Sequence, residues 1–118
     1  MNVKIYKYIN LDYLDMMSDG DESMKKTMLE MLLEELPREF GEMTKLLEQE
    51  NWETLSSVSH KMKSTLAFVG NEEMTIANQQ VEQIAKSNPS AESLTGLIYS
   101  LIRMCPLVVS ELEDEFSK

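Results

Sequence analysis

Apolar side chains recur at every third or fourth position along one long stretch of the chain, and this spacing continues through a proline. The residues that carry the pattern are Met28 or Leu29, Leu32, Leu36, Phe40, Met43 and Leu47. A loop at Pro37 would usually shift the phase of such a pattern. The spacing therefore predicts one helix over residues 21–50 that bends at Pro37. The alternative is two helices that divide at Leu36, because a residue before proline disfavours the helical region.

Three more segments repeat this spacing, and each follows a residue that favours an N-cap. The caps are Asn51, Asn71 and Ser90, and Gly70 can end the first of the three helices in the left-handed conformation. Pro106 should bend the last helix. The three apolar stripes are Trp52, Leu55, Met62, Leu66 and Val69; Met74, Ala77, Val81 and Ile84; and Leu94, Leu97 or Ile98, Leu101, Cys105, Val108, Leu112 and Phe116.

A shorter segment, "INLDYLDMMSDGD", precedes the four long ones. Leu11, Leu14 and Met17 lie at helical spacing in it, Gly20 offers a left-handed stop, and Asp21 offers an N-cap for the next helix. Gly and Pro number only 4 and 3 among 118 residues, which favours helices. Short connections make successive helices antiparallel. The chain is therefore predicted to be all-α, an antiparallel up-down four-helix bundle with a short extra N-terminal helix and a single domain over residues 1–118.

The charge of the chain narrows its possible partners. A formal net charge of -10 repels nucleic acid and anionic lipid, so neither is expected to bind. The single cysteine, Cys105, lies in an apolar run and is expected to be buried, which fits a reducing cytoplasm. The N-terminus lacks the apolar core of a signal peptide, and no run approaches the roughly 18 apolar residues that span a membrane. These features favour a cytoplasmic location. We also expect a monomer, since four helices can close one hydrophobic core.

The only histidine, His60, falls outside the apolar stripe of its helix. At about 100° per residue from Leu55, Met62, Leu66 and Val69 lie within about 40°, whereas His60 lies at roughly 140°. The ring is therefore expected to be exposed. Its neighbours one or two turns away are mostly small: Ser56, Lys63, Ser64 and Ala67.

Most histidine chemistry is a poor match for this arrangement. One histidine without cysteine partners does not make a zinc site, and Glu-x-x-His pairs for two irons are missing, so no metal is expected. Ser56 and Ser64 lie one turn away, but nothing suggests an oxyanion hole or a cleft for a bundle enzyme. Nucleophilic attack on an activated phosphorus remains, because it needs only an exposed neutral ring and a cation such as Lys63 to offset the product's charge.

The stretch "SHKMKSTLAFVG" resembles the signature of histidine phosphotransfer (HPt) domains of bacterial phosphorelays. His60 matches the phospho-accepting histidine, Lys63 matches the family's lysine, and Val69-Gly70 match its Leu-Gly. Val81-Glu82 resemble the family's Leu-Glu on the following helix, and the order of predicted helices is similar over nearly the whole chain. Ser59 replaces the usual alanine. Ser64 replaces the usual glycine, so its hydroxyl can either bond the phosphoryl group or crowd the partner, which puts the transfer rate in question.

The resemblance implies a mechanism and a set of residue roles. A receiver domain carrying a phospho-aspartate docks, Nε2 of His60 attacks, and the phosphoryl group passes to another receiver. The partner, a response-regulator receiver or a hybrid sensor histidine kinase, supplies Mg²⁺, and this chain needs no cofactor and has no ATP-dependent kinase activity. Glu82 is the first candidate to hold Nδ1 and Gln79 the second. The residues that this resemblance implies for catalysis are His60, Lys63 and Ser64. The residues that it implies for docking of the partner are Ser56, Lys61, Ala67 and Phe68.

Several alternatives stay open at this level. Phe68 either packs under the leading helix, which we favour, or joins the docking surface. The chain is either free-standing, which its ends favour, or part of a hybrid kinase. The main competing function is a helical adaptor that binds a partner through an apolar groove, with His60 incidental.

Overall fold

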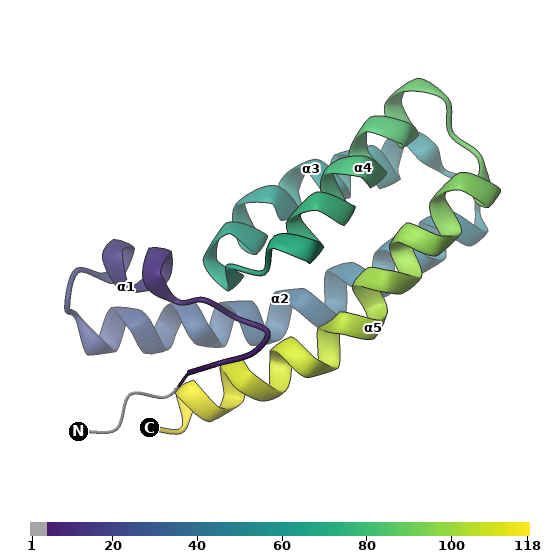
Figure 1. Ribbon diagram of the computed structural model, residues 1–118. Helices are drawn as coiled ribbons and strands as arrows, with labels where there is room; N and C mark the ends of the chain where they lie inside the picture. The colour runs from purple at the N-terminus through teal and green to yellow at the C-terminus, as the bar shows by residue number, and fades with distance from the viewer. Residues whose placement is uncertain (1–4) are drawn as a thin grey trace.

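Four long antiparallel helices and one short helix make up the described part of the chain (Figure 1). The computed structural model describes residues 5–118. The helices are α1 (Asp12–Ser18), α2 (Glu22–Glu48), α3 (Trp52–Val69), α4 (Glu72–Ser87) and α5 (Ala91–Phe116). Helices α2 to α5 pack in a ring, because each contacts the helix before and after it and α5 closes on α2. The predicted all-α bundle with a short extra N-terminal helix is confirmed.

Helix α2 runs without interruption through Pro37, so the one-helix prediction is confirmed and the division at Leu36 is wrong. The proline removes one backbone N–H, but the apolar stripe on either side of it stays in phase. The stripe residues Leu29, Leu32, Leu36, Phe40, Met43 and Leu47 are all buried. Pro106 lies inside α5 in the same way. Burial of a continuous stripe outweighs one lost hydrogen bond in both helices.

Each of the four long helices begins at the predicted cap. The side chains of Asp21, Asn51, Asn71 and Ser90 accept a hydrogen bond from the backbone N–H three residues further on. Gly70 ends α3 with φ of 71°, as predicted. These caps satisfy backbone N–H groups at each N-terminus and set where each helix starts.

Helix α1 corrects one sequence prediction. Leu11 and Leu14 are buried as expected, but Met17 is 49% exposed and the small Ser18 takes the inward position. In a helix of seven residues, the spacing of apolar side chains does not decide which of two adjacent positions faces the core. The stop is also one residue earlier than predicted, because Asp19 already adopts the left-handed conformation before Gly20. Among the other predicted stripe residues, those only partly buried are Met28, Trp52, Ile84, Leu97 and Phe116.

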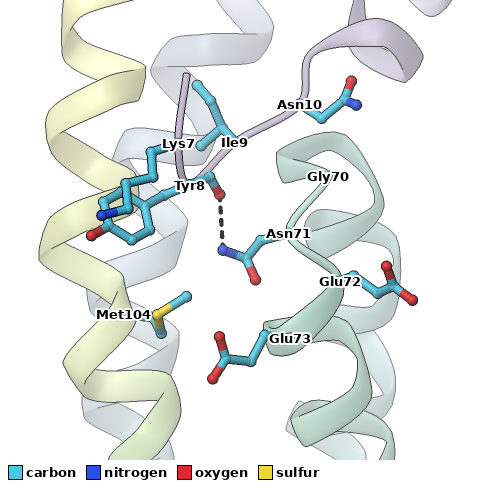
Figure 2. Close-up of a pocket in the computed structure, with 9 residues that line it drawn as sticks. All are labelled: Lys7, Tyr8, Ile9, Asn10, Gly70, Asn71, Glu72, Glu73 and Met104. Atoms are coloured by element: carbon cyan, nitrogen blue, oxygen red, sulfur yellow. Dashed lines mark hydrogen bonds between the residues drawn. The ribbon is translucent and has the colours of Figure 1, made fainter. Parts of the chain in front are cut away.

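The segment before α1 is hydrogen-bonded to α5 and to the turn between α3 and α4. Helices α2 and α5 have 27 and 26 residues, whereas α3 and α4 have 18 and 16, so α2 and α5 extend past the four-helix part (Figure 1). The Glu111 carboxylate on α5 accepts hydrogen bonds from the backbone N–H groups of residues 7, 8 and 9. The Asn71 amide donates to the Tyr8 carbonyl at 2.8 Å (Figure 2), and the Asn10 N–H donates to the Val69 carbonyl at 2.9 Å.

A second carboxylate, Glu115, ties this segment to α2. It accepts hydrogen bonds from the Lys25 ammonium at 2.8 Å and from the Tyr6 hydroxyl at 2.8 Å. Burial alone would raise the pKa of Glu115, but the hydrogen bonds from Lys25, Tyr6 and Lys118 outweigh it and lower that pKa to about 2. The carboxylate is therefore more stable as an anion in the folded chain than in the unfolded one.

Helix α5 is long and apolar enough, by its length and a mean hydropathy of 1.4, to cross a membrane. This qualifies the expectation drawn from runs of apolar residues alone. Its inward residues Leu94, Ile98, Leu101, Cys105, Val108 and Leu112 belong to the core of the bundle. Core helices of globular proteins pass the same test, so this property is weak evidence for a membrane span.

We predict that Gly70→Ala destabilises the protein more than Gly20→Ala. Both glycines have left-handed φ values, of 71° and 78°, which should cost an alanine about 1–2 kcal/mol. An added Cβ meets nothing at Gly20, but at Gly70 it would overlap the Asn10 carbonyl oxygen. Displacing that segment should cost about 1–3 kcal/mol more. Urea unfolding of both variants measures the difference, and equal losses would show that the N-terminal segment does not press on Gly70.

We predict that Glu115→Gln lowers the free energy of unfolding at pH 7 by roughly 2–3 kcal/mol. The folded pKa lies below the unfolded one, so the contribution of Glu115 is fully present above about pH 4.5 and is lost as the pH falls toward 2. Wild type and variant should therefore converge in stability over that range. Urea unfolding at several pH values tests this, and a constant difference from pH 7 to pH 2 would contradict it.

Candidate functional site

His60 stands on the outer face of α3, and its side chain is 65% exposed. The core residues Leu55, Met62, Leu66 and Val69 are buried on the opposite face of the helix. The exposure expected from the helical wheel is therefore confirmed. Ser64 and Ala67, one and two turns further along, are also exposed, so the ring is open to a large partner.

Glu82 of α4 lies directly against the ring. Its carboxylate Oε2 is 2.7 Å from Nδ1 of His60, and its side chain is only 9% exposed. Lys86, one turn further along α4, donates to the same oxygen at 2.8 Å, and the Lys63 ammonium lies 3.8 Å from the other oxygen. The hydrogen bond from Lys86 is the main influence that lowers the pKa of Glu82; burial opposes it and His60 reinforces it. Glu82 is therefore an anion at neutral pH.

The charge of Glu82 decides which nitrogen of His60 is free. An ionised carboxylate can only accept hydrogen bonds, so the 2.7 Å contact requires a proton on Nδ1. In the neutral ring, the other nitrogen then carries a lone pair. In the neutral form of this exposed ring, Nε2 is therefore the nitrogen with the free lone pair.

A buried polar pair behind the site joins α3 to α4. The Ser59 hydroxyl lies 2.8 Å from the carbonyl oxygen of Asn78 and 2.9 Å from its side-chain oxygen, and the Asn78 amide donates to the Ser59 carbonyl at 2.9 Å. Both residues are almost fully buried, at 0% and 2% exposed. Ser59 precedes His60, and Asn78 lies one turn before Glu82. The pair therefore fixes the register that brings ring and carboxylate together.

From the sequence we interpreted Ser59 only as a replacement for the usual alanine, and we did not predict its pairing with Asn78. The indication was present, because on the wheel Ser59 falls about 40° from Leu55 and so within the core stripe. A polar side chain at a core position needs a buried partner. The same reasoning missed Lys86, although its i, i+4 spacing from Glu82 on one helix indicated that the two side chains could pair.

The remaining predicted residues fall into different environments. Ser56 is buried at 7% exposed, so it contributes little surface for docking; it lines a hollow of about 270 Å³ together with Ser57, His60 and Lys86. Lys61 donates to Glu39 of α2 at 3.2 Å. Gln79 is exposed, and Glu82 rather than Gln79 contacts the ring. Phe68 is half-buried against Tyr13 of α1, with ring centroids 5.2 Å apart, which confirms the packing that we favoured for it.

The contact between Glu82 and His60 is thus present in the structure, while the functional roles of the site residues stay predictions. Within residues 5–118, no group of three or more His, Cys, Asp or Glu side chains is arranged to hold a metal ion.

Comparison with known proteins gives one family match. The family model described as "Hpt domain" matches residues 27–116, which is more than half of the chain. The match begins in α2 and ends at the last residue of α5, so it includes the four long helices apart from the first turn of α2. No curated protein matches the chain.

We predict that Ser59→Ala destabilises the protein by about 1–3 kcal/mol, because the buried side-chain oxygen of Asn78 loses the hydroxyl that donates to it, while the amide keeps its bond to the backbone carbonyl of residue 59. Ser57→Ala is the matched control, since the Ser57 hydroxyl is exposed and bonds only the Glu53 carbonyl of its own helix. That control should change stability by less than about 0.5 kcal/mol. Urea unfolding of the two variants measures both, and equal effects would show that the pair does not hold α3 to α4.

Proposed function

Because the chain belongs to the Hpt domain family, whose members act in histidine phosphotransfer in phosphorelays, we propose that His60 is its phosphoryl acceptor. In this proposal, His60 takes the group from a receiver-domain phospho-aspartate and passes it to another receiver aspartate. The observation that carries the proposal is the 2.7 Å contact between Nδ1 and Glu82 on an otherwise exposed ring. It places the proton of the neutral ring on Nδ1, so that Nε2 carries the lone pair and points away from the carboxylate, as a nucleophile requires.

The transfer of the phosphoryl group needs no further reacting group from this chain. The Nε2 lone pair attacks the phosphorus of the aspartyl phosphate, and an N–P bond forms while the P–O bond to the aspartate breaks. The aspartate carboxylate leaves with the electron pair. The ring keeps its Nδ1 proton and becomes positively charged, and the Glu82 anion at 2.7 Å stabilises that charge. In the onward step, a second aspartate carboxylate attacks the phosphorus and the electron pair returns to Nε2.

Lys63 and Ser64 are proposed to bind the phosphoryl group. Both lie one turn after His60 on α3 and are exposed, so they can reach an oxygen of a group held on Nε2. The lysine offsets the added negative charge, and the hydroxyl can donate a hydrogen bond. Ser64 stands where the family has glycine, so its effect on the rate of transfer remains to be measured.

The partner is proposed to be a receiver domain, either of a response regulator or of a hybrid sensor histidine kinase. We expect it to supply Mg²⁺ and most of the stabilisation of the transition state, in a chain located in the cytoplasm. Docking would place the receiver over the exposed ridge of His60, Ser64 and Ala67, where small neighbours leave room.

A helical adaptor is the second candidate, and one observation favours it. An apolar groove of about 490 Å³ lies between α2 and α5, and it is lined by Pro37, Phe40, Gly41, Thr44, Ile102, Cys105, Pro106 and Val109. The groove is formed by α2 and α5, whereas His60 stands on α3. The two candidates therefore make opposite predictions for a change at His60.

We predict that His60→Gln abolishes phosphorylation of this protein by phosphorylated receivers from the same genome. Wild type should acquire an acid-labile, alkali-stable label, as a phosphorus–nitrogen bond requires, and the variant should stay at background. The chain has no second histidine, so the label can have only one histidine site.

Circular dichroism and urea unfolding confirm that the variant is folded before its result is interpreted. An equal label on His60→Gln would overturn the proposal. No label on folded wild type from any receiver would favour the adaptor, as would a partner that binds the His60→Gln variant as tightly as wild type.

A further inference from the structure

Two lysines contact the Glu82 carboxylate, one through a short hydrogen bond and the other through a longer ion pair. Lys86 donates to Oε2 at 2.8 Å, the same oxygen that contacts the His60 ring, whereas Lys63 lies 3.8 Å from Oε1. The two ammonium side chains are similarly exposed, at 58% and 52%. A separation of 2.8 Å is a full charge-assisted hydrogen bond, whereas 3.8 Å is only a loose ion pair.

We propose that Lys86 is a positioning residue for His60: it orients the Glu82 carboxylate and offsets part of its charge, which limits how strongly that carboxylate favours a second proton on the ring. This inference rests on the proposed function. It also separates the roles of the two lysines, since Lys63 remains available for the phosphoryl group while Lys86 is engaged with Glu82.

Electrostatics gives the reason for a second cation at this site. A lone carboxylate 2.7 Å from Nδ1 would favour a doubly protonated, positively charged ring, which has no lone pair to attack with. A cation on the same carboxylate oxygen reduces that attraction while it leaves the Nδ1 hydrogen bond in place. Lys86 is suited to this because it lies one turn from Glu82 on the same helix, and its geometry is set by α4 alone.

The other charged groups near the ring do not provide this function. On α3, Lys63 is the only other cation that contacts Glu82 among the described residues. On the α2 side, Glu39 faces α3, but it is paired with Lys61 at 3.2 Å and with Arg38 at 3.6 Å. The state of the ring is thus set mainly by Glu82 and the two lysines that hold it.

The test compares Lys86→Met with Lys63→Met in phosphorylation of the whole chain by phosphoramidate, which needs no receiver. The initial rate is measured between pH 5 and pH 9. Lys86→Met should move the acid limb of the rate profile to higher pH by about 0.5–1 unit, because protonation of the ring becomes easier. Lys63→Met should lower the plateau about tenfold or more and move the acid limb less.

A second readout does not depend on phosphorylation. The single histidine gives one set of ring proton resonances, and the pH range over which they move can be followed by NMR in each variant. That range should shift upward in Lys86→Met. Lys45→Met, which removes an exposed lysine from the last turn of α2, is the charge-matched control and should match wild type.

The outcomes separate this inference from the proposed function. An unshifted rate profile and an unshifted NMR titration in Lys86→Met would overturn the role of Lys86, even if His60 is phosphorylated. A shifted NMR titration in Lys86→Met, together with a folded wild type that no phosphodonor labels, would support the role of Lys86 in setting the ring while overturning the phosphotransfer proposal. Equal shifts in Lys86→Met and Lys63→Met would contradict the division between the two lysines.

Discussion

The hydrogen bonds between Ser59 and Asn78 fix the register of α3 against α4, and the geometry of the whole site depends on that register. Both side chains are buried, so a slip between the helices would leave polar groups unpaired inside the bundle. With this register fixed, the next residue on α3 and the next turn of α4 place His60 and Glu82 at hydrogen-bond distance. Apolar packing alone would tolerate small shifts that this contact would not.

Charge gives the site its chemical character. The chain as a whole carries a net charge of -10, yet the His60 ring shares one carboxylate with two lysines. Such a local cationic group within an acidic protein suits a site that gains negative charge when a phosphoryl group arrives. The carboxylate keeps the proton of the neutral ring on Nδ1, and Lys86 limits how strongly it attracts a second proton to the ring.

The helices and the exposure of His60 could be predicted from the sequence because they depend on residues close together in it. Periodic apolar positions and capping residues act within a few residues, and the unbroken phase at Pro37 was enough to identify one helix. The N-terminal segment could not be predicted, because the Glu111 carboxylate that holds it lies about a hundred residues away in sequence. Lys86 was missed although its i, i+4 spacing from Glu82 is visible in the sequence, because many such pairs on exposed helix faces carry no function. Met17 was misplaced because α1 is too short for its spacing to decide between adjacent positions.

¹⁵N NMR of the histidine ring, before and after phosphorylation with phosphoramidate, shows directly which ring nitrogen carries the proton and which one bonds phosphorus. We expect the neutral ring to carry its proton on Nδ1 and phosphorus to become bonded to Nε2 in the product. Since the chain has one histidine, both assignments are unambiguous. A ring protonated on Nε2, or phosphorus bonded to Nδ1, would contradict the role given to Glu82, and a folded protein that forms no phosphohistidine would contradict the proposed function itself.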